Sequence, residues 1–123
     1  MPKISINVRL KSDEDDLEYE LVGSLNKEKG ILTYFEPTDE KTKVEYFYKE
    51  SKLIRSNKAL DMTYIFNLNK ETEGIINVKD LNRTLSVKIK TKDLVIKEHD
   101  IKLKFLVENH EFIYNIEVKE TPA

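Results

Sequence analysis

The sequence predicts an all-β fold: a single antiparallel up-and-down meander closed into a β-barrel of about eight to ten strands, spanning residues 1–123 as one domain. Three observations lead to it. Apolar and polar residues alternate along most of the chain, as in strands with one buried face. Short turn sequences separate the alternating runs, and no segment is clearly helical. A meander this long must either close or split into two packed sheets, and its sequential hairpins favour closure.

The strands follow one another in order. The first alternates isoleucine, valine and leucine with polar residues, and the acidic run Asp13–Asp16 turns the chain into a second strand that ends near Gly23. Asn26 to Gly30 forms the next turn, and the following strand is closed by Pro37. The expected strands are residues 4–10, 17–21, 31–36, 42–48, 52–56, 60–68, 75–78, 85–89, 101–107 and 112–118.

Two of these strands need further justification. TKVEYFY at 42–48 partly satisfies a helical spacing, but its β-branched and aromatic residues favour a strand. The run at 60–68 alternates with unusual regularity, placing Leu60, Met62, Tyr64, Phe66 and Leu68 on one face.

Composition excludes several classes of protein. Charged residues make up 36% of the chain, but the net charge is only −2, which argues against nucleic acid or a membrane surface as the main partner. The absence of cysteine removes disulfides and thiol chemistry. No apolar run is long enough for a signal peptide or a membrane span, so a cytoplasmic location is expected. Abundant lysine, isoleucine and asparagine are typical of an AT-rich bacterial genome.

No catalytic or metal-binding motif is present. His99 and His110 are the only histidines and lack a third ligand at a metal-site spacing. The run Asp13–Asp16 lacks the glycine and the distal glutamate of a calcium loop. We therefore expect no enzyme, metal or cofactor. The strand lysines are interpreted as a solvated face rather than a nucleic-acid surface: Lys88, Lys90, Lys92, Lys102 and Lys104.

Arg55 is the residue that most needs an explanation. If Leu53 points inward, the strand period carries Arg55 inward too, where a guanidinium needs a carboxylate partner. Glu36 is the candidate, because it shares the face of Leu32 and Tyr34. Such a pair near one end of the barrel is either a structural peg or the polar end of a ligand pocket.

Several segments resemble the small bacterial YwiB-like family, whose function is not established. They are LTYFE at 32–36, TKVEYFY at 42–48, LIRSN at 53–57 and LSVKIKTKDL at 85–94, with Met62 and Phe66. The resemblance implies a calycin-like, lipocalin-type barrel and no particular activity. The chain departs from the family pattern where the family places glycine: Asn57 and Arg83 stand there instead.

Two functions from different classes remain open. The first is a carrier of a small apolar or anionic molecule in the barrel interior. The second is a structural or protein-interaction module with a packed interior, which uses an exposed strand or the outer face at Phe47 to contact an unknown protein partner. Hydrolysis with Glu36 as base is a weaker third, since no nucleophile supports it. The residues predicted to bind the ligand are Tyr34, Glu36, Tyr46, Tyr48, Arg55, Met62, Tyr64 and Phe66.

Overall fold

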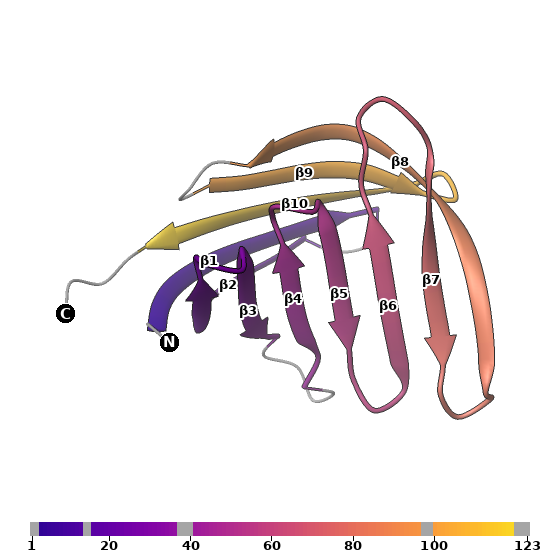
Figure 1. The fold of residues 1–123 in the computed structure, drawn as a ribbon, viewed down its shortest axis with the longest axis horizontal. Helices are drawn as coiled ribbons and strands as arrows, with labels where there is room; N and C mark the ends of the chain where they lie inside the picture. Colours follow the sequence, from indigo (N-terminus) through magenta and orange to yellow (C-terminus); the bar gives the residue numbers. More distant parts are fainter. Residues whose placement is uncertain (1–2, 14–15, 37–40, 97–99, 120–123) are drawn as a thin grey trace.

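The computed structural model describes residues 3–13, 16–36, 41–96 and 100–119, and within these ranges the chain forms ten β-strands (Figure 1). No helix occurs in them, and hence none long and apolar enough to cross a membrane. The strands are β1 (Lys3–Ser12), β2 (Asp16–Asn26), β3 (Ile31–Phe35), β4 (Lys43–Phe47), β5 (Lys52–Ser56), β6 (Leu60–Ile65), β7 (Thr72–Val78), β8 (Arg83–Ile96), β9 (Asp100–Val107) and β10 (His110–Lys119).

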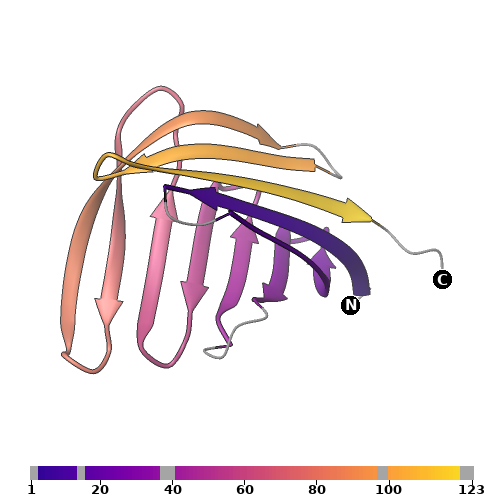
Figure 2. The ribbon, with the colours of Figure 1, turned by 180° about the vertical axis from the view of Figure 1, so that it is seen from behind.

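The ten strands form one closed antiparallel barrel in which each strand pairs with its neighbours in sequence. Closure occurs between the first and last strands, where β1 pairs with β10, for example Val8 with Ile116. The predicted all-β, up-and-down barrel is therefore confirmed. Figures 1 and 2 show that β1, β9 and β10 run across one end of the row of strands β3 to β7.

Two long strands turn the corners between these two layers. β2 pairs with β1 up to Ser24 and with β3 only from Ser24 onward. At this corner Gly23 is required, because a Cβ there would lie 2.7 Å from the carbonyl oxygen of Thr33. β8 pairs with β7 up to Ile89 and with β9 from Ile89 onward, with a register shift between residues 91 and 93. Such irregularities bend a strand, as a barrel corner requires.

The apolar core lies between the two layers, as the alternation predicts. Its largest fully buried side chains are Tyr34, Tyr46 and Phe105. Phe105 stacks against Phe112 and Tyr114, with ring centroids 5.6 and 5.9 Å apart. The centre of this barrel is thus filled by side chains rather than hollow, at least among the residues that the structure describes.

Some strand boundaries differ from those expected. β6 ends at Ile65 and Leu68 is half-exposed beyond it, so the regular alternation did not extend the strand. β7 begins at Thr72 and β8 continues to residue 96, because the bulge lets β8 follow both neighbours.

The structure also shows the backbone at the two positions, 57 and 83, where the resembling family places glycine. Asn82, before Arg83, adopts the left-handed backbone (φ 47°), whereas Asn57 is not among the residues with positive φ. The side-chain oxygen of Asn57 instead accepts hydrogen bonds from the amides of Ala59 and Leu60.

Candidate functional site

One row of inward-facing residues crosses six adjacent strands, from β3 to β8. Residues directly opposite each other in an antiparallel pair point to the same face, so the register identifies the row without ambiguity. It consists of Tyr34, Val44, Arg55, Met62, Ile76 and Leu85. We call this set the inner row.

Burial falls steadily along the inner row. Tyr34 and Val44 are each 2% exposed, Met62 and Ile76 are half-buried, and Leu85 is 45% exposed. Figure 1 shows why: the lower halves of β6, β7 and β8 extend beyond β1, β9 and β10, which cross their other ends. We call this uncovered part, formed by Met62, Ile76, Leu85 and the neighbouring inward residue Val87, the open end.

Arg55 lies in the inner row where the packed part meets the open end. Its Nε–H donates to Glu36 Oε1 at 3.2 Å, and an Nη2–H donates to the same oxygen. The Tyr19 hydroxyl donates to the other oxygen, Oε2, at 3.1 Å. Glu36 is only 6% exposed and the Arg55 side chain 23%. The ion pair expected between Glu36 and Arg55 is present, and Tyr19 completes it.

Glu36 does not saturate Arg55. A guanidinium has five N–H donors, and the two bonds to Oε1 use one on Nε and one on Nη2. Among the described residues no acceptor is recorded for the other Nη2 hydrogen or for Nη1. Burial opposes the charge of Arg55, but the Glu36 carboxylate, through its charge and its hydrogen bonds, outweighs burial and helps to raise the pKa of Arg55, so the group is a permanent cation.

The tyrosines around the ion pair are held in the neutral form. Burial raises the pKa of Tyr114 to about 12, although the charge of Arg55 acts in the opposite direction. Burial and then the Glu36 carboxylate raise the pKa of Tyr19, and burial also raises that of Tyr34. These hydroxyls are therefore hydrogen-bonding groups at physiological pH and not acids or bases.

The structure separates the eight predicted ligand-binding residues into two groups. Tyr34, Glu36, Arg55 and Met62 lie together, and the Tyr64 hydroxyl lies 3.6 Å from the sulfur of Met62. The remaining three do not join them.

Those three residues belong to the packed part of the barrel. Tyr46 is 1% exposed beside Leu53, and Phe66 packs on Phe105 with centroids 4.8 Å apart. Tyr48 follows β4 at the opposite end of the strands, where its amide donates to the carbonyl of Gly30. None of the three lines the open end.

Sequence reasoning missed Tyr19, Ile76 and Leu85 as members of the site. Their inward direction follows from the alternation. Their position at Glu36 or at the open end depends on where β2 and β8 turn, which no local pattern indicates.

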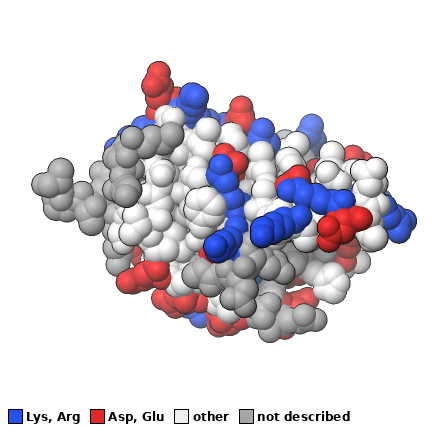
Figure 3. Space-filling view, turned by 90° about the horizontal axis from the view of Figure 1, so that it is seen from below, with Lys and Arg blue, Asp and Glu red and all other residues white. Residues whose placement is uncertain are grey.

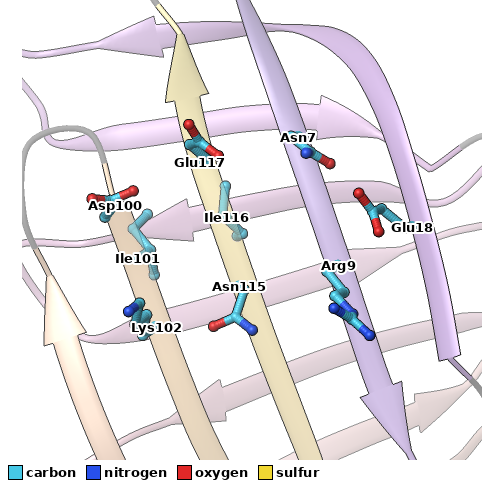
Figure 4. Close-up of a pocket in the computed structure, with 9 residues that line it drawn as sticks. All are labelled: Asn7, Arg9, Glu18, Asp100, Ile101, Lys102, Asn115, Ile116 and Glu117. Carbon is cyan, nitrogen blue, oxygen red and sulfur yellow. The ribbon is translucent and has the colours of Figure 1, made fainter.

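A hollow of about 220 Å³ lies on the outer face of β1, β2, β9 and β10 (Figure 4). It is lined by outward side chains of both charge signs, including Arg9, Glu18 and Glu117. The side-chain oxygen of Asn7 is buried there without a partner. Because basic and acidic side chains are mixed along its walls, the hollow favours neither an anionic nor a cationic ligand.

The remaining polar candidates are exposed. The His110 ring lies 3.3 Å from Asp13 on the surface, and no cluster of metal-ligating side chains occurs in the described ranges. His99 and residues 14–15 of the acidic run lie outside the described residues. The lysines of β8 are exposed. Lys104 of β9 forms an ion pair with Glu111 and lies opposite Asp93 in the strand register. Figure 3, which views the end with the β5–β6 and β7–β8 turns, shows basic and acidic side chains on the same face.

No family model matches the chain, and no curated protein matches it either. A solved structure does: the crystal structure of the ywiB protein from Bacillus subtilis resembles this one with a TM-score of 0.64 and 19% sequence identity. The match covers 98% of this chain and 91% of that protein. At this identity the likeness establishes a shared fold. The solved structure that shares the barrel thus carries the same family name as the resemblance seen in the sequence.

Proposed function

We propose that the chain binds a small amphipathic molecule at the open end, with an anionic or hydrogen-bond-accepting head group at Arg55 and an apolar part along Met62, Ile76 and Leu85. The observation that supports this proposal is the decrease in burial along the inner row. The row ends in inward apolar side chains that remain in contact with water. Covering such surface is favourable by about 25 cal/mol per Å². An apolar ligand would provide this cover, and the N–H groups of Arg55 for which no acceptor is recorded among the described residues would orient it.

This proposal narrows the carrier hypothesis. Tyr46, Tyr48 and Phe66 pack in or against the core and are assigned no contact with the ligand. Glu36 is assigned a supporting role, since its two oxygens already accept from Arg55 and Tyr19. We propose binding without catalysis. We also propose a cytoplasmic location, since the chain contains no cysteine and so lacks the disulfides that are common in secreted proteins.

The second candidate is a packed module that binds no small molecule. The filled centre of the barrel favours it. The two candidates differ at Arg55, which would only support the fold in the module but contact a ligand in the carrier.

The test uses native mass spectrometry of freshly purified protein, followed by titration with 8-anilinonaphthalene-1-sulfonate, a fluorescent apolar anion. The expected results are a bound small molecule or saturable dye binding, and dye affinity about tenfold lower in Arg55→Gln. Arg9→Gln is the matched control, because Arg9 also pairs with a carboxylate but on the outer face. Near-ultraviolet circular dichroism verifies that each variant is folded. Absence of both bound mass and saturable dye binding would leave the packed module as the function.

A further inference from the structure

The first part of β8 has an unpaired edge. β8 pairs with β7 over residues 83–89, but β9 joins it only from Ile89 onward. Along a strand, the backbone N–H and C=O groups of successive residues point alternately to the two sides. Every second residue before Ile89 therefore directs both groups away from β7.

Lys88 shows which residues these are. Its amide donates to the Glu108 carboxylate at 2.9 Å, and its carbonyl accepts from the Glu108 amide at 3.2 Å. By alternation, Ser86 and Thr84 direct their backbone groups to the same side. Both residues are exposed, and no hydrogen-bond partner on that side is recorded for either within the described ranges. We call residues 84–86 the free edge.

Neighbouring parts of the chain limit the length of the free edge at both of its ends. Glu108 occupies the backbone groups of Lys88, and the β7–β8 turn ends at Asn82, whose backbone is left-handed. Between them lies Leu85, 45% exposed, whose side chain faces the open end. An edge with unpaired backbone groups and an uncovered leucine is a template for another strand.

We propose that the free edge pairs with the free edge of a second copy of this chain, antiparallel, about a twofold axis at Leu85. Thr84 then lies opposite Ser86 of the second copy, and the two residues can exchange both backbone hydrogen bonds. The axis repeats this exchange on its other side and brings the two copies of Leu85 into contact. All exposed backbone groups of the free edge are satisfied in this register.

Three features favour a second copy over a longer strand from another protein. The blocked ends limit the partner to a short segment, and the free edge itself has the required length. The pairing places no two side chains of like charge directly opposite each other, because Arg83 lies opposite Val87 of the second copy. Leu85 is also the last residue of the inner row, so pairing joins the uncovered apolar surfaces of two barrels. So short an interface makes a weak, concentration-dependent dimer.

Sedimentation velocity over a range of protein concentrations tests this pairing. The wild-type chain is expected to form a reversible dimer. Ser86→Pro removes the N–H group from an edge position that tolerates proline, so it should preserve folding and raise the dissociation constant at least about tenfold. Leu85→Lys should also give a monomer. Ile75→Lys is the matched control and should remain dimeric, because Ile75 is 49% exposed but lies on the outer face of β7.

Amide hydrogen exchange provides a second measurement that requires no variant. The amides of Thr84 and Ser86 should exchange more slowly at high protein concentration. A monomer at millimolar concentration, or a dimer that survives both Ser86→Pro and Leu85→Lys, would overturn the pairing. Dye binding by monomeric Ser86→Pro tests the proposed function separately, because that substitution leaves Arg55 and the apolar side chains of the open end unchanged.

Discussion

Two arginine–carboxylate pairs stand on opposite faces of the barrel wall. Arg9 and Asp16 face outward, 3.3 Å apart, with about half of each side chain exposed. Arg55 and Glu36 face inward, with 23% and 6% exposed. Water solvates either partner of the outer pair when the other is absent, whereas the inner carboxylate depends on its arginine. We therefore expect the same chemistry to be dispensable on the outer face and required on the inner face.

The largest effect is expected from Arg55→Met, which leaves the buried Glu36 carboxylate without its cation. Removing one partner of a buried pair costs several kcal/mol, and the partial exposure of Arg55 places the loss near the lower end, at about 3 kcal/mol. Urea unfolding measures it. The double variant Arg55→Met with Glu36→Leu should recover most of the loss, because neither charge is then unpaired. A double variant as unstable as Arg55→Met would show that arginine packing, not charge, matters here.

Glu36→Gln should cost less than Arg55→Met, about 2 kcal/mol in the same unfolding measurement. The amide keeps an oxygen for Arg55, and the remaining cation is the more exposed partner and can reach water. An equal or larger loss from Glu36→Gln would contradict this asymmetry.

High pH should weaken the inner site. Burial raises the pKa of Tyr114 from 10 to about 12, so the folded state keeps a proton that the unfolded state loses. The contribution of Tyr114 to the free energy of unfolding is fully present below pH 10 and is lost as the pH rises through 12. At pH 11 this residue alone lowers the free energy of unfolding by about 1 kcal/mol. Thermal unfolding between pH 8 and pH 11 measures the decline. Tyr114→Phe should make it shallower, and an unchanged slope would exclude Tyr114 as a source.

The inner pair could be predicted from sequence because two short-range rules were sufficient. The period of two places Arg55 on the face of Leu53 and Glu36 on the face of Leu32. Antiparallel pairing of successive strands then makes β3, β4 and β5 adjacent, so the two residues lie near the same end. The closed barrel followed from the same rules.

The open end could not be predicted, because it depends on how the two layers overlap. That overlap is set where β2 leaves β1 for β3 at Gly23 and where β8 leaves β7 for β9 at Ile89. Tyr19 lies in the part of β2 before Gly23, which does not pair with β3. From this position its side chain reaches Glu36. Alternation gives each residue an inward or outward direction, but it does not indicate which inward residues another layer covers.

Tyr19→Phe tests the contribution of this unpredicted contact. Removing the hydroxyl leaves Glu36 Oε2 without that donor while the apolar ring still fills its place, so the expected loss is about 1 kcal/mol. The comparison with Glu36→Gln is informative: in the Gln variant the same Tyr19→Phe change should cost less, since its partner is no longer charged. Additive losses in the double variant would indicate that the hydroxyl does not act through Glu36.

The smallest effect is expected from Arg9→Gln, the outward counterpart of Arg55. Its partner Asp16 is well solvated, and glutamine retains most of the side chain that lies along the sheet surface. The melting temperature should therefore stay within experimental error of the wild type, at low salt and at high salt alike. A loss that disappears in high salt would show that the outer pair contributes through its charges. The difference between the two faces would then be one of degree, set by how far each pair is screened by water and ions.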